Sequence, residues 1–146
     1  MAHHSPFSNP PRILHMDEDE SRSSSFFDVL FWAGYEVVHI ALAAEAWKAL
    51  NSERYDLLIA NNKLPDLSGF ELLRKLRAAH SDLPVILATQ SAARETISQY
   101  PMLLPSATVV EPYTDKQLLE TVSSVLYFST LESQNHHASN CSTAML

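Results

Sequence analysis

The feature that most constrains this chain is a regular alternation between short apolar runs and segments with helical patterning. A segment with apolar residues three or four positions apart follows each apolar run, and the segment at 91–100 has the weakest apolar face. The apolar runs are 13–16, 35–40, 55–60, 84–88 and 108–110, and the helical segments begin near residues 20, 43, 68, 91 and 114. Short apolar strands separated by helices predict a parallel sheet with both faces covered. We therefore expect an α/β protein: a three-layer α/β/α sandwich whose doubly wound, five-stranded parallel sheet has (βα)5 order.

Capping residues mark several of the predicted helix ends. Gly34 follows the first helical segment in the position of a C-cap. Ser68 and Glu71 have the spacing of a capping box, and so do Thr114 and Gln117. These pairs predict that two helices begin just after Ser68 and Thr114.

Length and composition predict one domain in an acidic chain. The 146 residues suit a single domain over 12–128, with a flexible N-terminal lead at 1–11 and a flexible polar tail at 129–146. No apolar run reaches the roughly 18–20 residues of a membrane span, so no membrane contact is expected. Cys141 is the single cysteine, which excludes an internal disulfide, and we expect a cytoplasmic location. With 10 Lys and Arg against 17 Asp and Glu, the net charge of -7 argues against a nucleic-acid partner.

Polar residues follow four of the five predicted strands. Asp17 and Glu18 follow the first strand, and Asn61 follows the third. Thr89 follows the fourth strand and Glu111 the fifth. In open parallel sheets ligands bind at the carboxyl ends of the strands, where the strand order reverses. We therefore expect three carboxylates, one amide and one hydroxyl to share a pocket.

The sequence resembles the receiver domains of response regulators over residues 12–128. RILHMDEDES is similar to the first strand and acidic pair of that family, and YDLLIANNKLPDLSGFELLRKLR is similar to its phosphoacceptor strand, proline loop and third helix. AGYEVVHIALAAEAWKAL, LPVILATQS and VVEPYTDKQLLETV resemble other stretches of the family. The spacing also agrees, because Pro65 lies four residues after position 61 and Glu111 lies 22 residues after Thr89. The resemblance implies a flavodoxin-like (CheY-like) fold and a role in two-component (phosphorelay) signal transduction.

Four residues match functional positions of the family. Receivers use two acids after the first strand to hold Mg²⁺, and Asp17 and Glu18 stand at those positions. Thr89 matches the hydroxyl that contacts the phosphoryl oxygens. Pro112 matches the proline that follows a cis peptide bond.

Three other positions depart from the family pattern. Asn61 replaces the aspartate that accepts the phosphoryl group, and Glu111 replaces the lysine that contacts it. An amide oxygen is a poor nucleophile, and a carboxylate in place of the lysine repels the phosphoryl oxygens. Thr108 stands where an aromatic switch residue is usual. These departures predict a degenerate pseudo-receiver.

Two features of the predicted pocket have alternative interpretations. Asp17 and Glu18 either retain a weak Mg²⁺ site, to which Glu111 contributes, or are a solvated remnant. Lys63, two residues past Asn61, either pairs with one of the nearby acids or is simply exposed. No cofactor is required under either interpretation.

The favoured hypothesis is a stand-alone receiver-type signalling protein, not an enzyme, that acts by phosphorylation-independent protein contact. Fewer than 20 residues follow the last predicted helix, so we expect no output domain on this chain. The expected partner is a histidine kinase, another regulator or a second copy of the chain. Tyr100, Thr108 and Tyr113 are the candidate residues of the partner face, although both tyrosines can instead pack on the fold.

Two alternative functions remain open at this point. The chain could still accept a phosphoryl group on another carboxylate, such as Asp66 or Asp56. It could also be a flavodoxin-like carrier of a flavin cofactor, although such a fold binds phosphate through backbone N–H groups in the loop after the first strand. That loop is acidic here, and the two glycines of the chain, Gly34 and Gly69, lie elsewhere.

Overall fold

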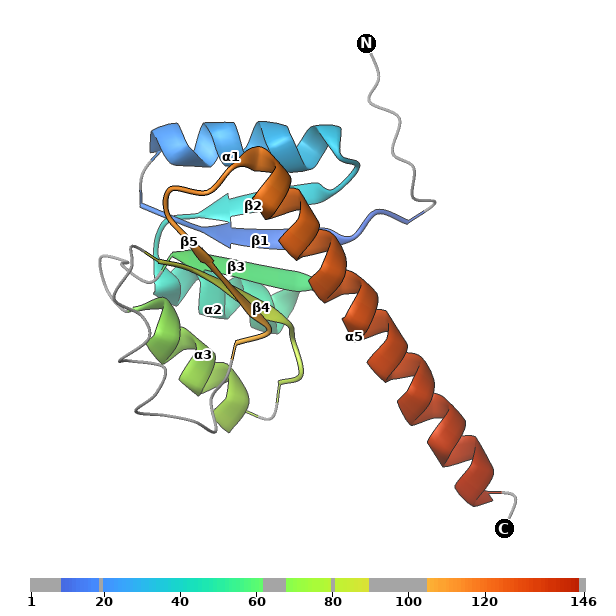
Figure 1. Cartoon of the computed structure of the whole chain (residues 1–146). Helices are drawn as coiled ribbons and strands as arrows, with labels where there is room; N and C mark the ends of the chain where they lie inside the picture. The colour runs from blue at the N-terminus through green and yellow to red at the C-terminus, as the bar shows by residue number, and fades with distance from the viewer. Residues whose placement is uncertain (1–8, 19, 62–67, 80, 90–104, 145–146) are drawn as a thin grey trace.

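The chain folds around a five-stranded parallel sheet, as the sequence predicts. The computed structural model describes residues 9–18, 20–61, 68–79, 81–89 and 105–144 (Figure 1). The strands lie in the order β2-β1-β3-β4-β5, and every neighbouring pair is parallel. They are β1 (Arg12–Met16), β2 (Glu36–Ile40), β3 (Leu57–Asn61), β4 (Val85–Thr89) and β5 (Ala107–Val110).

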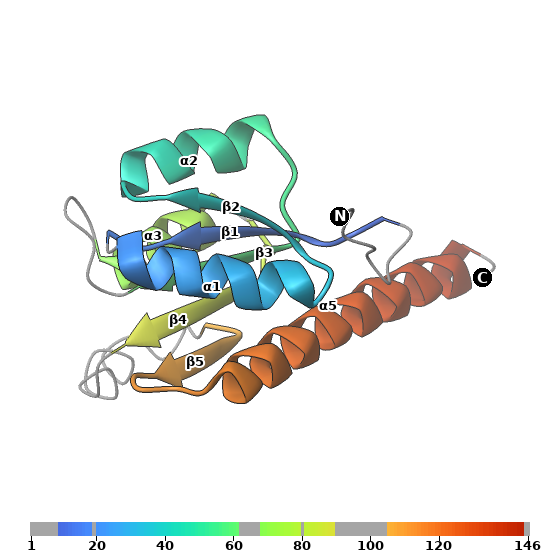
Figure 2. The same cartoon turned by 90° about the horizontal axis from the view of Figure 1, so that it is seen from above.

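Helices cover both faces of the sheet, which confirms the three-layer sandwich. Among the described residues they are α1 (Glu20–Trp32), α2 (Ala43–Ser52), α3 (Gly69–Ala78) and α5 (Asp115–Ala144). Figure 2 shows α1 and α5 on one face and α2 with α3 on the other. The helix predicted at 91–100 lies outside the described residues.

Each face of the sheet has its own apolar core, because side chains alternate along the strands. In β3, Leu57 and Ile59 pack under α1 and α5, whereas Leu58 and Ala60 pack under α2 and α3. All four side chains are fully buried, as expected for a parallel strand covered on both faces. Asn61 ends the same strand and follows the same alternation. The packing of the two cores therefore determines the direction of its side chain.

The predicted caps of three helices are confirmed. Gly34 has a φ of 104°, and the N–H groups of Gly34 and Tyr35 donate to the carbonyls of Phe31 and Leu30, as in a Schellman motif. Ser68 Oγ accepts a hydrogen bond from the Glu71 backbone N–H at 3.1 Å.

The Thr114–Gln117 capping box is complete in both directions. The backbone N–H of Thr114 donates to Gln117 Oε1 at 2.8 Å, and the backbone N–H of Gln117 donates to Thr114 Oγ1 at 3.1 Å. Two of the donors at the start of α5 are therefore satisfied by side chains.

The last helix is longer than the sequence predicts. The expected flexible tail starts at residue 129, but α5 continues as a helix to Ala144. Residues 115–144 contain neither glycine nor proline, so nothing in them interrupts the backbone hydrogen-bonding pattern. The second half of α5 projects past the amino ends of the strands (Figures 1 and 2). Within the described residues, no helix is both long and apolar enough to cross a membrane.

Candidate functional site

The switch in strand order places two of the predicted site residues next to each other. The chain proceeds from β1 to β2 on one side and returns to β3 on the other, so the crevice lies between β1 and β3. Asp17 directly follows β1, and its backbone N–H donates to the Ile40 carbonyl at 3.3 Å. Asn61 is the last residue of β3 and lies in register with Ala88 of β4. The two side chains therefore flank the crevice at the carboxyl end of the sheet.

Asp17 and Asn61 form a buried hydrogen-bonded pair. Asn61 Nδ2 donates to Asp17 Oδ2 over 3.4 Å, a long hydrogen bond. The exposed fractions of the two residues are only 4% and 7%. A buried carboxylate requires a donor or a cation near it, and here the amide supplies a donor. An aspartate at position 61 could not do so when ionised, because a carboxylate only accepts hydrogen bonds.

Helix α3 approaches the backbone of Asn61 closely at Gly69. A Cβ atom built on Gly69 would lie only 2.7 Å from the Asn61 carbonyl oxygen, which is closer than real Cβ contacts. Glycine is therefore required at this position by space, although its φ angle is ordinary. No role for Gly69 was predicted, and the one signal in the sequence is a glycine directly after the N-cap Ser68.

Thr89 and Glu111 are joined through the backbone. The Glu111 N–H donates to the Thr89 carbonyl at 2.8 Å, which keeps the loop after β5 beside the end of β4. Thr89 is buried with an exposed fraction of 7%, and Glu111 is partly exposed. The peptide bond between Glu111 and Pro112 is cis. Thr89 is thus the last residue of β4, which pairs with β3, the strand that ends at Asn61.

Other predicted residues lie farther from this arrangement or outside the described residues. Glu18 is exposed, in contrast to the buried Asp17 beside it. Thr108 is exposed on β5, and Tyr113 is half-buried with its ring edge-on to Phe26, 6.3 Å between centroids. Lys63 and Tyr100 lie outside the described residues. Thr108 and Tyr113 are therefore the two residues of the predicted partner face that lie within the described part of the chain.

The residues present do not fit the Mg²⁺ site that receivers build with two acids after the first strand. Within the parts of the chain that the structure describes, no three His, Cys, Asp or Glu side chains gather as a metal site would need. Asp17 is hydrogen-bonded to an amide donor, and Glu18 faces solvent. Mg²⁺ binds through one or two carboxylates plus waters, so at most a weak site is expected.

The model of the response regulator receiver domain matches residues 13–123, most of the chain. The chain therefore belongs to the response regulator receiver family of two-component signal transduction. It is 30% identical over 124 residues to the response regulator MprA of Mycobacterium ulcerans (strain Agy99), covering 83% of this chain and 52% of that protein. It is 34% identical over 88 residues to MprA of Mycobacterium avium (strain 104), covering 60% and 37%. The chain spans about half the length, or less, of these curated relatives.

Solved structures agree on the fold. The CheY-like receiver domain protein from Methanospirillum hungatei JF-1 has a TM-score of 0.79 at 29% identity, over 85% of this chain and 99% of that one. The signal receiver domain of a putative Luxo repressor protein from Vibrio parahaemolyticus has a TM-score of 0.80 at 21% identity, over 86% and 97%. The expected flavodoxin-like fold, with strand order 2-1-3-4-5, is confirmed.

Proposed function

We propose that this receiver domain signals by protein contact without accepting a phosphoryl group. The observation that carries the proposal is the buried pair in which the Asn61 amide donates to Asp17, at the position where receivers carry their acceptor carboxylate. Transfer to a receiver requires a carboxylate oxygen to attack phosphorus. Asn61 offers a weak nucleophile instead, and its amide is already engaged with the neighbouring acid.

Electrostatics support the same conclusion. Charge that develops on transferring phosphoryl oxygens is normally stabilised by a cation or by hydrogen-bond donors. Glu111 stands where the family has its lysine, so the residue at this position repels those oxygens. The Asn61 donor gives the buried Asp17 carboxylate a hydrogen bond, which lowers the cost of keeping that carboxylate in the folded pocket. The domain then carries out no reaction and requires no cofactor.

A constitutive surface is the expected means of signalling. Receiver domains interact with histidine kinases in two-component systems, and a kinase, another regulator or a second copy of this chain is the proposed partner. Thr108 is exposed on β5 and has no ring that could move between buried and exposed positions. The Tyr113 ring packs edge-on to Phe26 and remains half-buried. The net charge of -7 makes nucleic acid an unsuitable partner.

The alternative, in which another carboxylate of the chain accepts the phosphoryl group, has little support from the positions of those carboxylates. Asp56 precedes β3, at the end of the sheet opposite the crevice, and its Oδ2 accepts a hydrogen bond from the Arg12 backbone N–H at 2.9 Å. Asp66 lies outside the described residues. A flavodoxin-like cofactor role has no specific observation in its favour.

The test is phosphorylation by acetyl phosphate with Mg²⁺, measured by intact-mass spectrometry. We expect no stable gain of one phosphoryl group, and we expect capture of a partner from native lysate to be unaffected by the treatment. A gain that persists in Asn61→Ala would show that another residue accepts the group. A gain lost in Asn61→Ala would show that Asn61 itself, or a carboxylate formed from it, is competent. Either gain would contradict the proposal.

A further inference from the structure

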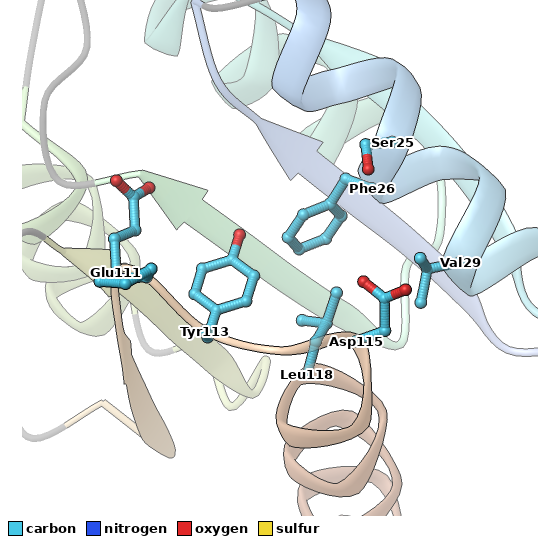
Figure 3. Close-up of a pocket in the computed structure, with 8 residues that line it drawn as sticks. Ser25, Phe26, Val29, Glu111, Tyr113, Asp115 and Leu118 are labelled. Carbon is cyan, nitrogen blue, oxygen red and sulfur yellow. The ribbon is translucent and has the colours of Figure 1, made fainter.

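The Tyr113 ring stands beside free space. It lines a pocket of about 600 Å³ between α1 and the segment that joins β5 to α5. In Figure 3 the ring lies between Glu111 and Phe26, and Val29 and Leu118 also line the pocket. Side chains occupy staggered rotamers, and free space of this size leaves more than one of them open to Tyr113. The contacts of the ring therefore decide which orientation it takes.

Phe26 contacts the Tyr113 ring and is itself anchored on the sheet. The two ring planes meet at 89°, the edge-to-face arrangement that aromatic pairs prefer. Phe26 also stacks on His15 of β1, with centroids 3.9 Å apart and planes within 2° of parallel. Both Phe26 and His15 are buried, and His15 lies in a strand that pairs on both sides, with His39 and with Ile59. Phe26 therefore keeps its place if the Tyr113 ring turns.

The backbone on either side of Tyr113 is also fixed. Two residues before it, the Glu111 N–H donates to the Thr89 carbonyl at 2.8 Å. Directly after it, the Thr114 N–H donates to Gln117 Oε1 at 2.8 Å, as part of the capping box. The rotamer of the side chain is therefore the main freedom left to Tyr113. An edge-to-face aromatic contact favours one of two orientations by roughly two- to tenfold.

We propose that Phe26 is a positioning residue, which holds the Tyr113 ring in one orientation as a preformed part of the partner face. The proposal rests on the proposed function in taking Tyr113 as part of that face, whereas the orientation of the ring does not depend on it. A ring that is fixed before binding lowers the ordering cost that a partner must overcome. The contact between the two rings needs no phosphoryl group, so this part of the face is formed constitutively.

NMR of the whole chain, labelled with ¹³C and ¹⁵N, tests the orientation directly. The three-bond couplings from the Tyr113 Cγ to its backbone N and carbonyl C report the populations of the side-chain rotamers. In the unaltered chain we expect the couplings of a single rotamer. In Phe26→Leu the side chain stays apolar but the ring is lost, so the population of that rotamer relative to the others should fall roughly two- to tenfold. Averaged couplings in the unaltered chain, or unchanged couplings in Phe26→Leu, would overturn the proposal.

Two comparisons separate positioning from general packing. Phe27→Leu is the matched control, because Phe27 is the next residue of α1, is exposed and stacks on Phe31, and it should leave the Tyr113 couplings unchanged. Tyr35 is buried in the same core as Phe26 and should keep its own couplings in Phe26→Leu. If Tyr35 lost its rotamer to the same extent, or if Phe27→Leu acted equally, Phe26 would only support the core and the positioning role would be wrong. Intact mass after acetyl phosphate decides the proposed function separately.

Discussion

At position 61, an amide side chain determines the hydrogen bonding of the buried pocket. Asn61 donates to Asp17, so these two residues are compatible without a cation between them. A second carboxylate at position 61 would face Asp17 across a buried contact, which is costly unless a cation or a proton intervenes. Under the proposed function, Asn61 and Glu111 affect the same charge balance.

Restoring the acceptor alone should restore little phosphorylation. We expect Asn61→Asp to label slowly with acetyl phosphate, because Glu111 still repels the phosphoryl oxygens. Asn61→Asp combined with Glu111→Lys should label about a hundredfold faster, since one positioned donor is worth that much in comparable sites. Residues of one site behave non-additively, so Glu111→Lys alone should give nothing.

The control for the double variant is Asn61→Asp combined with Glu111→Gln. This pair removes the repulsion without supplying a cation, so its labelling rate should fall between the other two. The rates are measured by intact mass against time. If Asn61→Asp alone labels as fast as either double variant, the role assigned to Glu111 is wrong.

The close contact beneath Asn61 leads to a second prediction at the same scale. In Gly69→Ala the added methyl group would lie 2.7 Å from the Asn61 carbonyl oxygen, so α3 must move away. We expect a loss of about 1–3 kcal/mol of unfolding free energy in urea, the usual range for overpacking. Arg74→Ala on the exposed side of the same helix should change it by less than about 0.5 kcal/mol. An unchanged or stabilised Gly69→Ala would mean that α3 adjusts without strain.

The elements could be predicted wherever local sequence decides their structure. Apolar runs identified all five strands, and the capping box at Thr114 and Gln117 correctly located the start of α5. The predicted end of the last helix was wrong. The polar composition of residues 129–146 was interpreted as a tail, although α5 continues through them to Ala144 without a residue that stops a helix. The role of Gly69 and the apolar pocket at Phe26 could not be predicted, since both depend on contacts between elements distant in sequence. The candidate site residues were predicted from their positions after the strands, and the order of the strands then places Asp17 beside Asn61.

The capping box of α5 is expected to contribute measurably to stability. Thr114→Ala removes the side-chain acceptor of the Gln117 N–H, so this donor at the start of α5 loses its partner. We expect a loss of about 1 kcal/mol in chemical unfolding, the usual cost of deleting an N-cap side chain. Ser124→Ala, at an exposed position inside the same helix, is the matched control and should cause no loss. Equal effects of the two substitutions would show that the cap contributes nothing specific.

At the scale of the whole molecule, the body and the projecting part of α5 are built differently. The first turns of α5 place Leu118, Val122 and Val125 in the core over the sheet. Beyond them, Tyr127 and Phe128 are each 62% exposed, and the helix continues away from the strands (Figure 1). Stability should therefore come almost entirely from residues before this projection.

Truncation tests this division directly. Ending the chain after Leu131 removes a helical segment that projects from the body, so we expect the unfolding free energy to change by less than about 0.5 kcal/mol. Ending it after Ser124 also removes Val125, which is 8% exposed, together with Leu126, which packs against the same core. That shorter chain should lose at least about 2 kcal/mol, because deleted core side chains cost both transfer and cavity energy. Urea unfolding of both chains, monitored by far-UV circular dichroism, gives the comparison. A large loss in the longer chain would mean that residues 132–146 pack on the body or on a second copy, and sedimentation of the full chain at two concentrations would distinguish those cases.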